Sequence, residues 1–154
     1  MDIVIKRANI DDLKIIQELN NRLFELEFNN FDSSLKLNWP YGEEGTNYFK
    51  DMIEKEIVLL AVTENQVVGY LAGSLNVEAS YNTRSLAEID NMFILEEYRK
   101  YGIGRKLIDE FKKYAKENNI EELKVTASAK NVNAILFYKK NGLEEFDVTL
   151  KMKI

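Results

Sequence analysis

The chain has 154 residues, of which 45% are hydrophobic and 31% are charged, and its formal net charge is −5. This composition excludes a disordered or low-complexity chain and fits a single folded domain over residues 1–154. The chain has no cysteine and no histidine, which excludes disulfide bonds, thiolate metal sites and catalysis by Ser–His–Asp or Cys–His groups.

The charge distribution says more than the total. Residues 99–116 hold seven basic and two acidic side chains, whereas residues 17–56 hold nine acidic and four basic ones. One short stretch therefore suits an anion and the rest suits a cation, unless both are simply solvated helix faces. The acidic balance argues against a nucleic-acid partner. No apolar run reaches the roughly 18 to 20 residues of a membrane span, and residues 1–7 have no signal-peptide core, so we expect a cytoplasmic protein.

Hydrophobic spacing predicts strands alternating with helices along the chain. Strands are expected at 2–7, 57–63, 67–77, 86–95 and 122–128, and the alternation of Val148, Leu150, Met152 and Ile154 predicts a last one. Helices are expected after the capping residue Asn9, at 44–55, from 103 to about 119, and at 133–140. Residues 29–41 are expected to form a loop and 64–66 a hairpin turn. The order predicts one mixed α/β domain with a strand–helix–strand unit in its second half.

The most informative stretch is the sequence ILEEYRKYGIGRKL, from Ile94 to Leu107. A strand enters a glycine-containing turn that opens a helix, and a helix start offers unpaired N–H groups and the positive end of the dipole. Gly102 and Gly104 lack the Cβ atoms that would keep an anion off the backbone, and four basic side chains surround them. The pattern predicts a phosphate-binding turn. It has neither the GxxxxGK[ST] of a P-loop nor the third glycine of a dinucleotide fingerprint.

Within this stretch, Arg99-x-x-Gly102-x-Gly104 resembles the acetyl-CoA pyrophosphate motif of the GNAT N-acetyltransferases. Downstream, NVNAILFYKKNGL at 131–143 is similar to a second motif of that family, N-x-x-A…FY-x-x-x-G. The resemblance covers nearly the whole chain and is weakest over 17–56. It implies a single GNAT-type domain with a mixed, mostly antiparallel, splayed sheet flanked by about four helices. It also implies transfer of an acetyl group from acetyl-CoA to a primary amine.

The resemblance further implies which positions hold acetyl-CoA: the backbone of a bulged strand, the turn, and the start of the last helix. The matching residues are Met92, Phe93, Ile94, Arg99, Lys100, Gly102, Ile103, Gly104, Arg105, Asn131, Asn133, Ala134 and Tyr138. Without the family, Met92 to Ile94 are core strand residues and Asn131 is a helix N-cap.

Three catalytic residues are also implied. Tyr138 matches the tyrosine that protonates the departing thiolate, although from spacing alone it is a core aromatic beside Phe137. Glu88 and Asp90 are two apart on a strand and face one side of the sheet. Glu88 matches the base of histone-acetylating members, and Asp90 stands near the catalytic carboxylate position of polyamine-acetylating members. We favour Glu88 as the base, with Asp90 as the alternative.

The expected reaction is direct attack of the amine on the thioester in a ternary complex, since no cysteine can carry the acyl group. No metal is expected, and a homodimer is possible. A cationic acceptor, such as a polyamine, a lysine-like amine or a peptide N-terminus, would suit the acidic residues Glu25, Glu27, Asp32, Glu43, Glu44 and Glu78, with Trp39 and Tyr41 as stacking surfaces. The alternative is a non-catalytic acyl-CoA-binding or regulatory module on the same fold.

Overall fold

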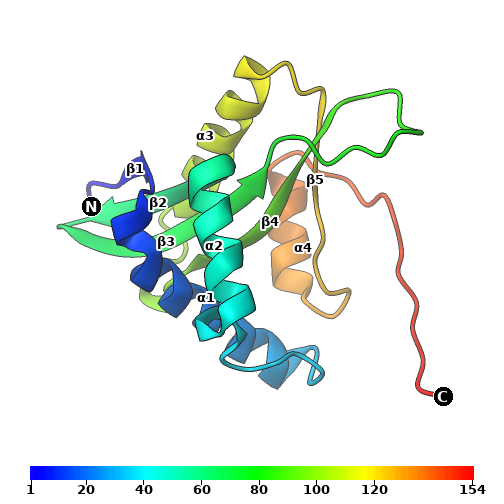
Figure 1. The fold of residues 1–154 in the computed structure, drawn as a ribbon, viewed down its shortest axis with the longest axis horizontal. Helices are drawn as coiled ribbons and strands as arrows, with labels where there is room; N and C mark the ends of the chain where they lie inside the picture. The colour runs from blue at the N-terminus through cyan, green and yellow to red at the C-terminus, as the bar shows by residue number, and fades with distance from the viewer.

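A five-stranded sheet forms the centre of the protein in the computed structural model, which describes residues 1–154 (Figure 1). The strands lie in the order β1-β2-β3-β4-β5, and every neighbouring pair is antiparallel except the parallel pair β4–β5. Their bounds are Val4–Arg7 (β1), Ile57–Thr63 (β2), Gln66–Ser74 (β3), Leu86–Ile94 (β4) and Glu122–Val125 (β5). This is the mixed, mostly antiparallel sheet that the sequence predicts.

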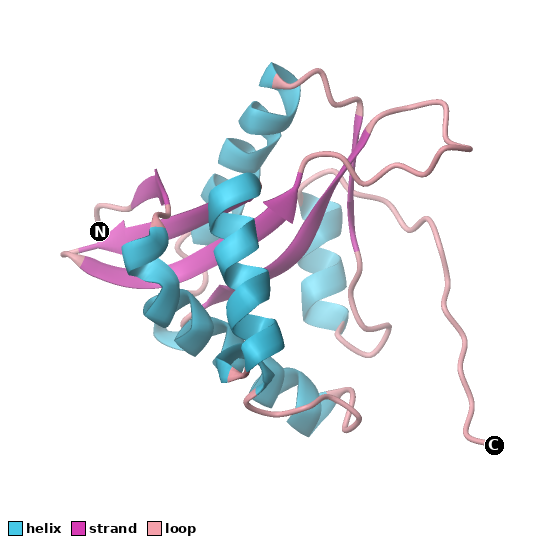
Figure 2. Ribbon diagram, in the orientation of Figure 1, coloured by secondary structure: helices cyan, strands magenta, loops and turns pink.

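Four helices cover the two faces of this sheet. Their bounds are Leu13–Asn30 (α1), Glu43–Lys55 (α2), Ile103–Glu117 (α3) and Val132–Lys140 (α4). Helices α1 and α2 lie in front of the sheet in the orientation of Figure 2, and α3 and α4 lie behind it. None of these helices is long and apolar enough to cross a membrane.

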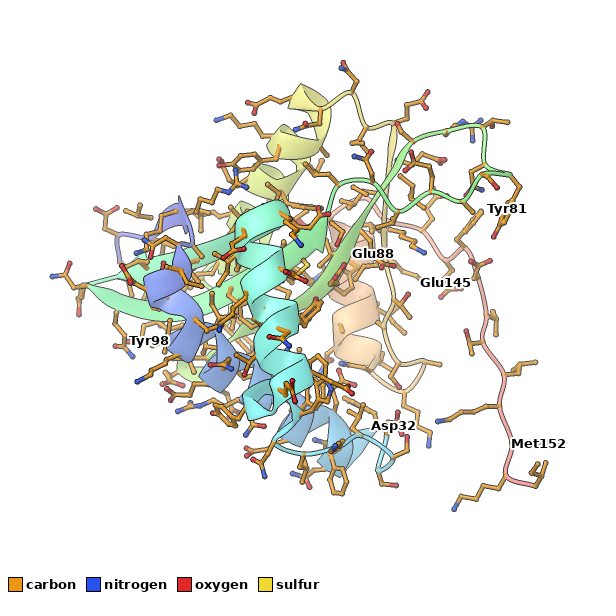
Figure 3. All side chains as sticks on the ribbon, in the orientation of Figure 1. Asp32, Tyr81, Glu88, Tyr98, Glu145 and Met152 are labelled. Atoms are coloured by element: carbon orange, nitrogen blue, oxygen red, sulfur yellow. The ribbon has the colours of Figure 1, made fainter.

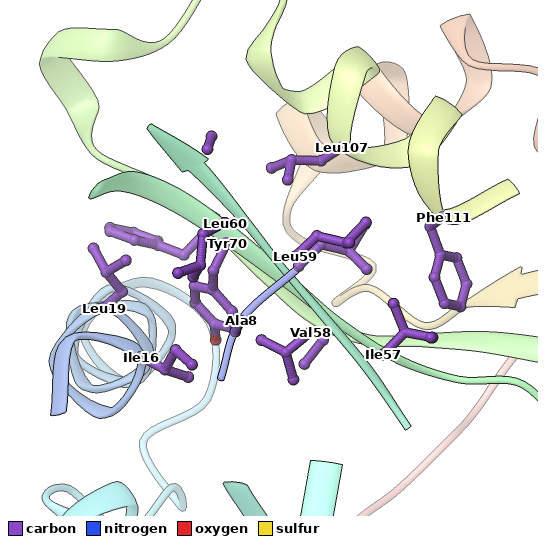
Figure 4. Close-up of a cluster of buried hydrophobic side chains, with 14 of the residues drawn as sticks. Ala8, Ile16, Leu19, Ile57, Val58, Leu59, Leu60, Tyr70, Leu107 and Phe111 are labelled. Atoms are coloured by element: carbon purple, nitrogen blue, oxygen red, sulfur yellow. The ribbon is translucent and has the colours of Figure 1, made fainter. Parts of the chain in front are cut away.

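The hydrophobic core is built on both faces of β2 and β3, which are almost wholly apolar and buried. Ile16 and Leu19 of α1 pack from one side, and Leu107 and Phe111 of α3 pack from the other (Figure 4). Helix α3 lies so close to β3 that a Cβ atom at Gly73 would stand 2.5 Å from the Phe111 ring. This packing fixes where α3 begins, and therefore where the glycine turn lies.

Most predicted elements are confirmed, with small shifts at their ends. Strand β2 has the predicted bounds. Asn9 caps a short 3₁₀ turn at Ile10–Asp12, which leads directly into α1, and forms a capping box with Asp12. Helix α1 extends to Asn30, so the expected loop begins later than predicted, and a short 3₁₀ turn occupies Trp39–Tyr41.

The predicted C-terminal strand is wrong for the single chain. Residues 143–154 are extended, and the only backbone hydrogen bond from this segment runs from the N–H of Leu143 to the carbonyl of Tyr138. A strand needs a neighbouring strand for its ladder, and no strand of the same chain pairs with this segment.

Candidate active site

The edge of β4 opens where the expected acetyl-CoA site begins. Strand β5 pairs with β4 only from Leu86 to Ile89 and ends at Val125. Beyond Ile89, β4 continues to Ile94 with β3 on one side and no strand on the other. Met92, Phe93 and Ile94 therefore lie on a stretch whose outer backbone groups are available to a ligand, as in the splayed sheet that the sequence analysis expects.

A β-bulge precedes this open stretch. Asn91 pairs with Ala72 and Ile89 pairs with Gly73, so Asp90 has no partner opposite it on β3. Consecutive side chains of a regular strand point to opposite faces, but here Asp90 and Asn91 both reach the hydroxyl of Tyr48 on α2. The bulge thus aims two polar side chains at the same face of the sheet.

The turn between β4 and α3 has the geometry of an anion site. Lys100 and Gly102 both adopt left-handed backbone conformations, with φ of 70° and 76°. None of the N–H groups from Lys100 to Arg105 donates a hydrogen bond within the chain, and the first to do so is that of Lys106, to the carbonyl of Gly102 at 3.1 Å. A Cβ atom at Gly102 would meet no atom within 4 Å. The free N–H groups and the positive end of the α3 dipole together favour a phosphate at this place.

Gly104 has a packing role that the sequence analysis did not anticipate. It is buried, and a Cβ atom there would stand 2.6 Å from Cζ of Phe137 on α4. Its missing side chain lets α3 and α4 approach, whereas the sequence suggested only that it clears the way for an anion. Arg99 already makes two contacts within the chain. Its Nε donates to the carbonyl of Ile94 at 2.9 Å, and its guanidinium lies 5.3 Å from the ring centre of Phe93.

Helix α4 brings the second motif to the same region. Asn131 is its N-cap, and its Oδ1 accepts a hydrogen bond from the N–H of Ala134 at 3.2 Å. The Nδ2 of Asn131 has no partner within the chain, so the residue can cap the helix and still donate to a ligand. Asn133 is exposed and Ala134 is partly buried.

Tyr138 packs against the core beside Phe137, with ring centres 5.2 Å apart in an edge-to-face arrangement. Burial, and to a lesser degree the negative charge of Glu27, raise the pKa of Tyr138 to about 12. The phenol therefore stays protonated at neutral pH. Burial is the main reason for the raised pKa of Tyr70, and the negative charge of an ionised Tyr138 would raise it further. The two hydroxyl groups are therefore close enough to influence each other.

A chain of hydrogen bonds crosses the face of the sheet under α1 and α2. Asn20 of α1 donates to the hydroxyl of Tyr70 at 2.7 Å, and Tyr70 donates to Oδ1 of Asn91 at 2.6 Å. Asn91 in turn donates to the hydroxyl of Tyr48 at 2.9 Å, and Tyr48 donates to Oδ2 of Asp90 at 2.8 Å. Every donor points toward Asp90, so the chain orients this carboxylate and favours its charged form.

The two candidate bases differ in their surroundings. Glu88 lies on β4 (Figure 3) and is paired with Lys124 of β5 at 3.3 Å. Asp90 has no cationic partner and is bonded to Tyr48 and Ser74. Although Asp90 is exposed as a whole residue, its carboxyl lies against these neighbours. Burial raises its pKa and outweighs the hydrogen bond from Tyr48, which lowers it, and the charge of Glu88 raises it further. A carboxylate that acts as a base near neutral pH must accept a proton, and a raised pKa makes it a better acceptor.

Sequence reasoning missed the residues that hold Asp90. Tyr48, Tyr70 and Asn91 come from three elements, and only the fold brings them together. The signal that could have found them is the presence of polar groups inside apolar segments, such as Tyr70 in VVGYLAG.

The acidic residues expected around the acceptor do not all lie at one place. Glu27 is partly buried, and its charge raises the pKa of Tyr138. The pKa of Glu27 is itself raised, first by burial and then by the charge of Asp32. Glu43 and Glu44 are exposed in the first turn of α2. Trp39 stacks on Phe24 with ring centres 5.7 Å apart, so it packs the loop, whereas Tyr41 is half exposed. No group of three or more Asp or Glu side chains is placed to hold a metal ion.

Comparison with known proteins agrees with this geometry. The sequence model that describes the acetyltransferase (GNAT) family matches residues 16–143 of this chain. An N-alpha-acetyltransferase of Sulfurisphaera tokodaii is 32% identical over 94% of this chain and 81% of its own length. Across the relatives, the matched stretch spans from 46% to 83% of the relative's length.

Two solved structures share the fold. An aminoglycoside acetyltransferase from an uncultured soil metagenomic sample, meta-AAC0020, is 28% identical over 99% of this chain and 96% of its own, with a TM-score of 0.71. The structure of AAC(6')-Iy with a bisubstrate analogue of CoA and acetylneamine has a TM-score of 0.79 at 14% identity, and covers 100% of this chain and 99% of its own. The splayed sheet, the glycine turn and the match over residues 16–143 lead to one conclusion: the chain belongs to the acetyltransferase (GNAT) family and is an N-acetyltransferase.

Proposed function

We propose that the protein transfers the acetyl group of acetyl-CoA directly to a primary amine of a cationic acceptor. The observation that carries this proposal is the continuity of the open β4 edge, Met92–Ile94, with the free N–H groups of Lys100–Arg105. The first would pair with the amide-bearing pantetheine arm, and the second would receive the pyrophosphate. Arg105 and Lys106, both exposed, would add charge beside it. The residues therefore fit acetyl-CoA as a substrate.

In the proposed reaction, the neutral amine attacks the thioester carbonyl carbon, the C–N bond forms, and the C–S bond breaks. Freeing a lysine-like amine of its proton at pH 7 requires about 4.6 kcal/mol, so a carboxylate must accept that proton. We propose Asp90 for this role rather than Glu88, because the Glu88 carboxylate is engaged in an ion pair with Lys124 at 3.3 Å, whereas Asp90 has no cationic partner. Tyr48 and Asn91 would keep the Asp90 carboxyl in place.

Tyr138 would donate its proton to the departing thiolate. With a pKa of about 12 it is a weaker acid than a free phenol. The same burial would also raise the pKa of the coenzyme thiol, because desolvation disfavours any anion. The difference in pKa between donor and acceptor at the site is therefore smaller than a comparison of the buried phenol with a thiol in water suggests.

A cationic acceptor is supported by the carboxylates on the acceptor side. The negative charge of Glu27 raises the pKa of Tyr138, and Asp90 accepts a hydrogen bond from Tyr48 of α2. Carboxylates at these two places would concentrate amines that carry additional positive charge. An aminoglycoside, the acceptor named for one of the similar proteins, carries several amines, whereas the N-alpha-acetyltransferase relative is named for an α-amino group, which carries no additional charge of its own.

The test is a panel of acceptors assayed by thiol release from acetyl-CoA: a polyamine, a lysine amide, a basic peptide, an aminoglycoside, a neutral amino sugar and an acidic amino acid. We expect the cationic members to give the highest kcat/KM, and added salt to raise KM with little change in kcat, since screening weakens encounter. A neutral or acidic compound as the best acceptor would contradict the proposed acceptor class.

A further inference from the structure

Trp39, the single tryptophan of the chain, belongs to a series of aromatic contacts that ends at the proposed base. Its ring stacks on Phe24 of α1, with ring centres 5.7 Å apart and planes 3° from parallel. The same ring lies 5.8 Å from the ring centre of Tyr48 of α2. The Tyr48 hydroxyl donates to Oδ2 of Asp90 at 2.8 Å. Two ring contacts and one hydrogen bond therefore connect α1 to the carboxylate.

Tyr48 has little freedom where it meets Asp90. Its hydroxyl donates to that carboxylate and accepts a hydrogen bond from Nδ2 of Asn91 at 2.9 Å. Its ring packs edge-to-face on Phe49, with ring centres 4.8 Å apart, and contacts Trp39. The phenol oxygen is fixed to the ring, so the position of the ring sets the position of the hydroxyl. A neighbour that holds the ring thereby also holds the hydrogen bond to the carboxylate.

Two buried amide side chains of α1 hold the short 3₁₀ turn that carries the tryptophan. Nε2 of Gln17 donates to the carbonyl of Pro40 at 2.8 Å and to Oγ1 of Thr46 at 3.0 Å. One helical turn later, Oδ1 of Asn21 accepts a hydrogen bond from the N–H of Asn38 at 3.2 Å. Burial of an amide costs free energy unless the amide is hydrogen-bonded, and these bonds offset that cost while they tie the turn to both helices.

The start of α2 packs closely against the same turn, which joins α1 to α2 at one end of this helix pair (Figure 1). A Cβ atom at Gly45, in the first turn of α2, would collide with the carbonyl oxygen of Trp39 and stand 2.7 Å from Cα of Pro40. Interiors packed at this density transmit small displacements. Tyr48 follows Gly45 by three positions on the same helix, so the turn and the Tyr48 ring share one support.

We propose that Trp39 is a positioning residue for the transfer reaction: it fixes the ring of Tyr48, and through that ring the carboxyl of Asp90. The proposal rests on the proposed function, because this role has a purpose only if Asp90 accepts the proton of the amine. It replaces the expectation that Trp39 stacks on the acceptor, since the ring already contacts Phe24 and Tyr48.

Loss of this support has a direction that a pH profile detects. Burial raises the pKa of Asp90, and the hydrogen bond from Tyr48 lowers it. A displaced Tyr48 therefore leaves Asp90 harder to ionise, and the fall of kcat on the acid side, the acid limb, moves to higher pH. Leucine at position 39 keeps apolar bulk there, and Asp90 does not contact that position, so its burial changes little.

The other groups that face Asp90 remain in place when Trp39 is replaced. They are the hydroxyl of Ser74 on β3 and the charges of Glu56, which follows α2, and of Glu88 on β4. The charge of Glu88 is in turn paired with Lys124 of β5. None of these groups belongs to the turn or to the aromatic series, so a shift of the acid limb reports on Tyr48.

The test compares the pH dependence of kcat, and KM for the acceptor, among variants of the aromatic series. Trp39→Leu should lower kcat by about 10-fold through misplacement of the base, move the acid limb to higher pH, and leave acetyl-CoA affinity unchanged by calorimetry. Trp39→Phe keeps a ring and should retain most of the wild-type kcat. Tyr41→Leu, in the same turn but outside the series, is the matched control and should leave the acid limb unmoved. A rise in KM alone for Trp39→Leu would show acceptor stacking and overturn the proposal.

A double-mutant cycle tests whether Trp39 acts through Tyr48. Tyr48→Phe should itself move the acid limb to higher pH, and in that background Trp39→Leu should lower kcat by less than about twofold further. The same loss in both backgrounds would overturn the proposal. If Trp39→Leu does not fold, as judged by thermal unfolding, Phe24→Leu takes its place: it removes the stacking partner and keeps Trp39. We expect a smaller shift in the same direction that Tyr48→Phe abolishes, and an unmoved acid limb would overturn the proposal.

Asp90→Asn, measured alongside, separates this inference from the proposed function. If Asp90→Asn leaves the acid limb intact, Asp90 is not the base, and the role of Trp39 is overturned with it. If Asp90→Asn removes the acid limb while Trp39→Leu and Phe24→Leu leave it unmoved, the base is confirmed and only the role of Trp39 is overturned. Loss of the acid limb in the first variant and its shift in the other two would support both.

Discussion

Gly104→Ala is expected to disturb both stability and catalysis through one contact between helices. The new Cβ atom would stand 2.6 Å from Cζ and 3.0 Å from Cε2 of Phe137, and 3.3 Å from Cδ1 of Ile94. Carbon atoms pack at about 3.5–4.0 Å, so the Phe137 ring must retreat by about 1 Å. Phe137 is followed directly by Tyr138, and the retreat therefore moves the proposed acid.

The magnitude follows from two opposing contributions. Overpacking of this kind destabilises by about 1–3 kcal/mol, and alanine recovers up to about 1 kcal/mol as a better helix former than glycine. With the full recovery, the net loss is about 0–2 kcal/mol, which corresponds to a fall of up to about 8 °C in Tm for a chain of this length. A displacement of about 1 Å at a catalytic group can lower kcat by about 100-fold.

The assay combines thermal unfolding with steady-state kinetics in a double-mutant cycle. Phe137→Leu removes the ring, so the penalty of Gly104→Ala should shrink in that background. Gly102→Ala is the matched control: its φ of 76° gives strain, but no atom lies within 4 Å of the new Cβ. Phe137→Leu should leave that penalty unchanged. Equal effects of Gly104→Ala in both backgrounds, within about 0.5 kcal/mol, would refute the assignment of Gly104 to this contact.

Three further outcomes are expected. Tyr138→Phe should lower kcat by about 100-fold, as for loss of a general acid, with acetyl-CoA affinity unchanged by calorimetry; an unaltered single-turnover rate would remove Tyr138 from the reaction. Asn131→Ala loses the cap on Ala134 and should destabilise by about 1 kcal/mol, whereas Asn131→Asp should retain most of the stability in the same melting experiment. Because burial raises the pKa of Asp90, its charged form is lost on acidification earlier than for a free carboxyl. The pH–rate profile should therefore fall on the acid side. Asp90→Asn should lose most activity at low pH and recover as the amine itself deprotonates, while Glu88→Gln should keep the activity and move the acid limb to lower pH, because the charge of Glu88 adds to the raised pKa of Asp90; the reverse pattern would make Glu88 the base.

Local patterns in the sequence predict the elements and the cofactor turn. Seven consecutive residues of β2 are apolar or β-branched, and its bounds are predicted without error. Gly102 adopts a left-handed backbone conformation that favours glycine. The basic residues that indicate an anion site lie beside it in the sequence, so no contact with a distant segment is needed to predict that site.

The remaining features depend on contacts between distant segments. The clearance at Gly104 is set by Phe137, 33 positions away along the chain. The Asp90 carboxyl depends on Tyr48, which is 42 positions away. Trp39 is a suitable stacking surface by residue type alone, but the fold places it on Phe24. The C-terminal alternation predicts a strand, yet a strand forms only where a neighbour supplies its hydrogen bonds.

The most direct measurement is the backbone amide spectrum of the isotopically labelled protein, recorded during titration with CoA. Binding at the open β4 edge and the glycine turn predicts that the largest shifts occur at Met92–Ile94 and Lys100–Arg105, whose N–H groups include those free in the unliganded chain. The amide of Ala134, next to the Asn131 cap, should also respond. Saturable binding that leaves these amides unshifted and moves others, such as those of Lys36–Glu44, would contradict the assignment of the acetyl-CoA site.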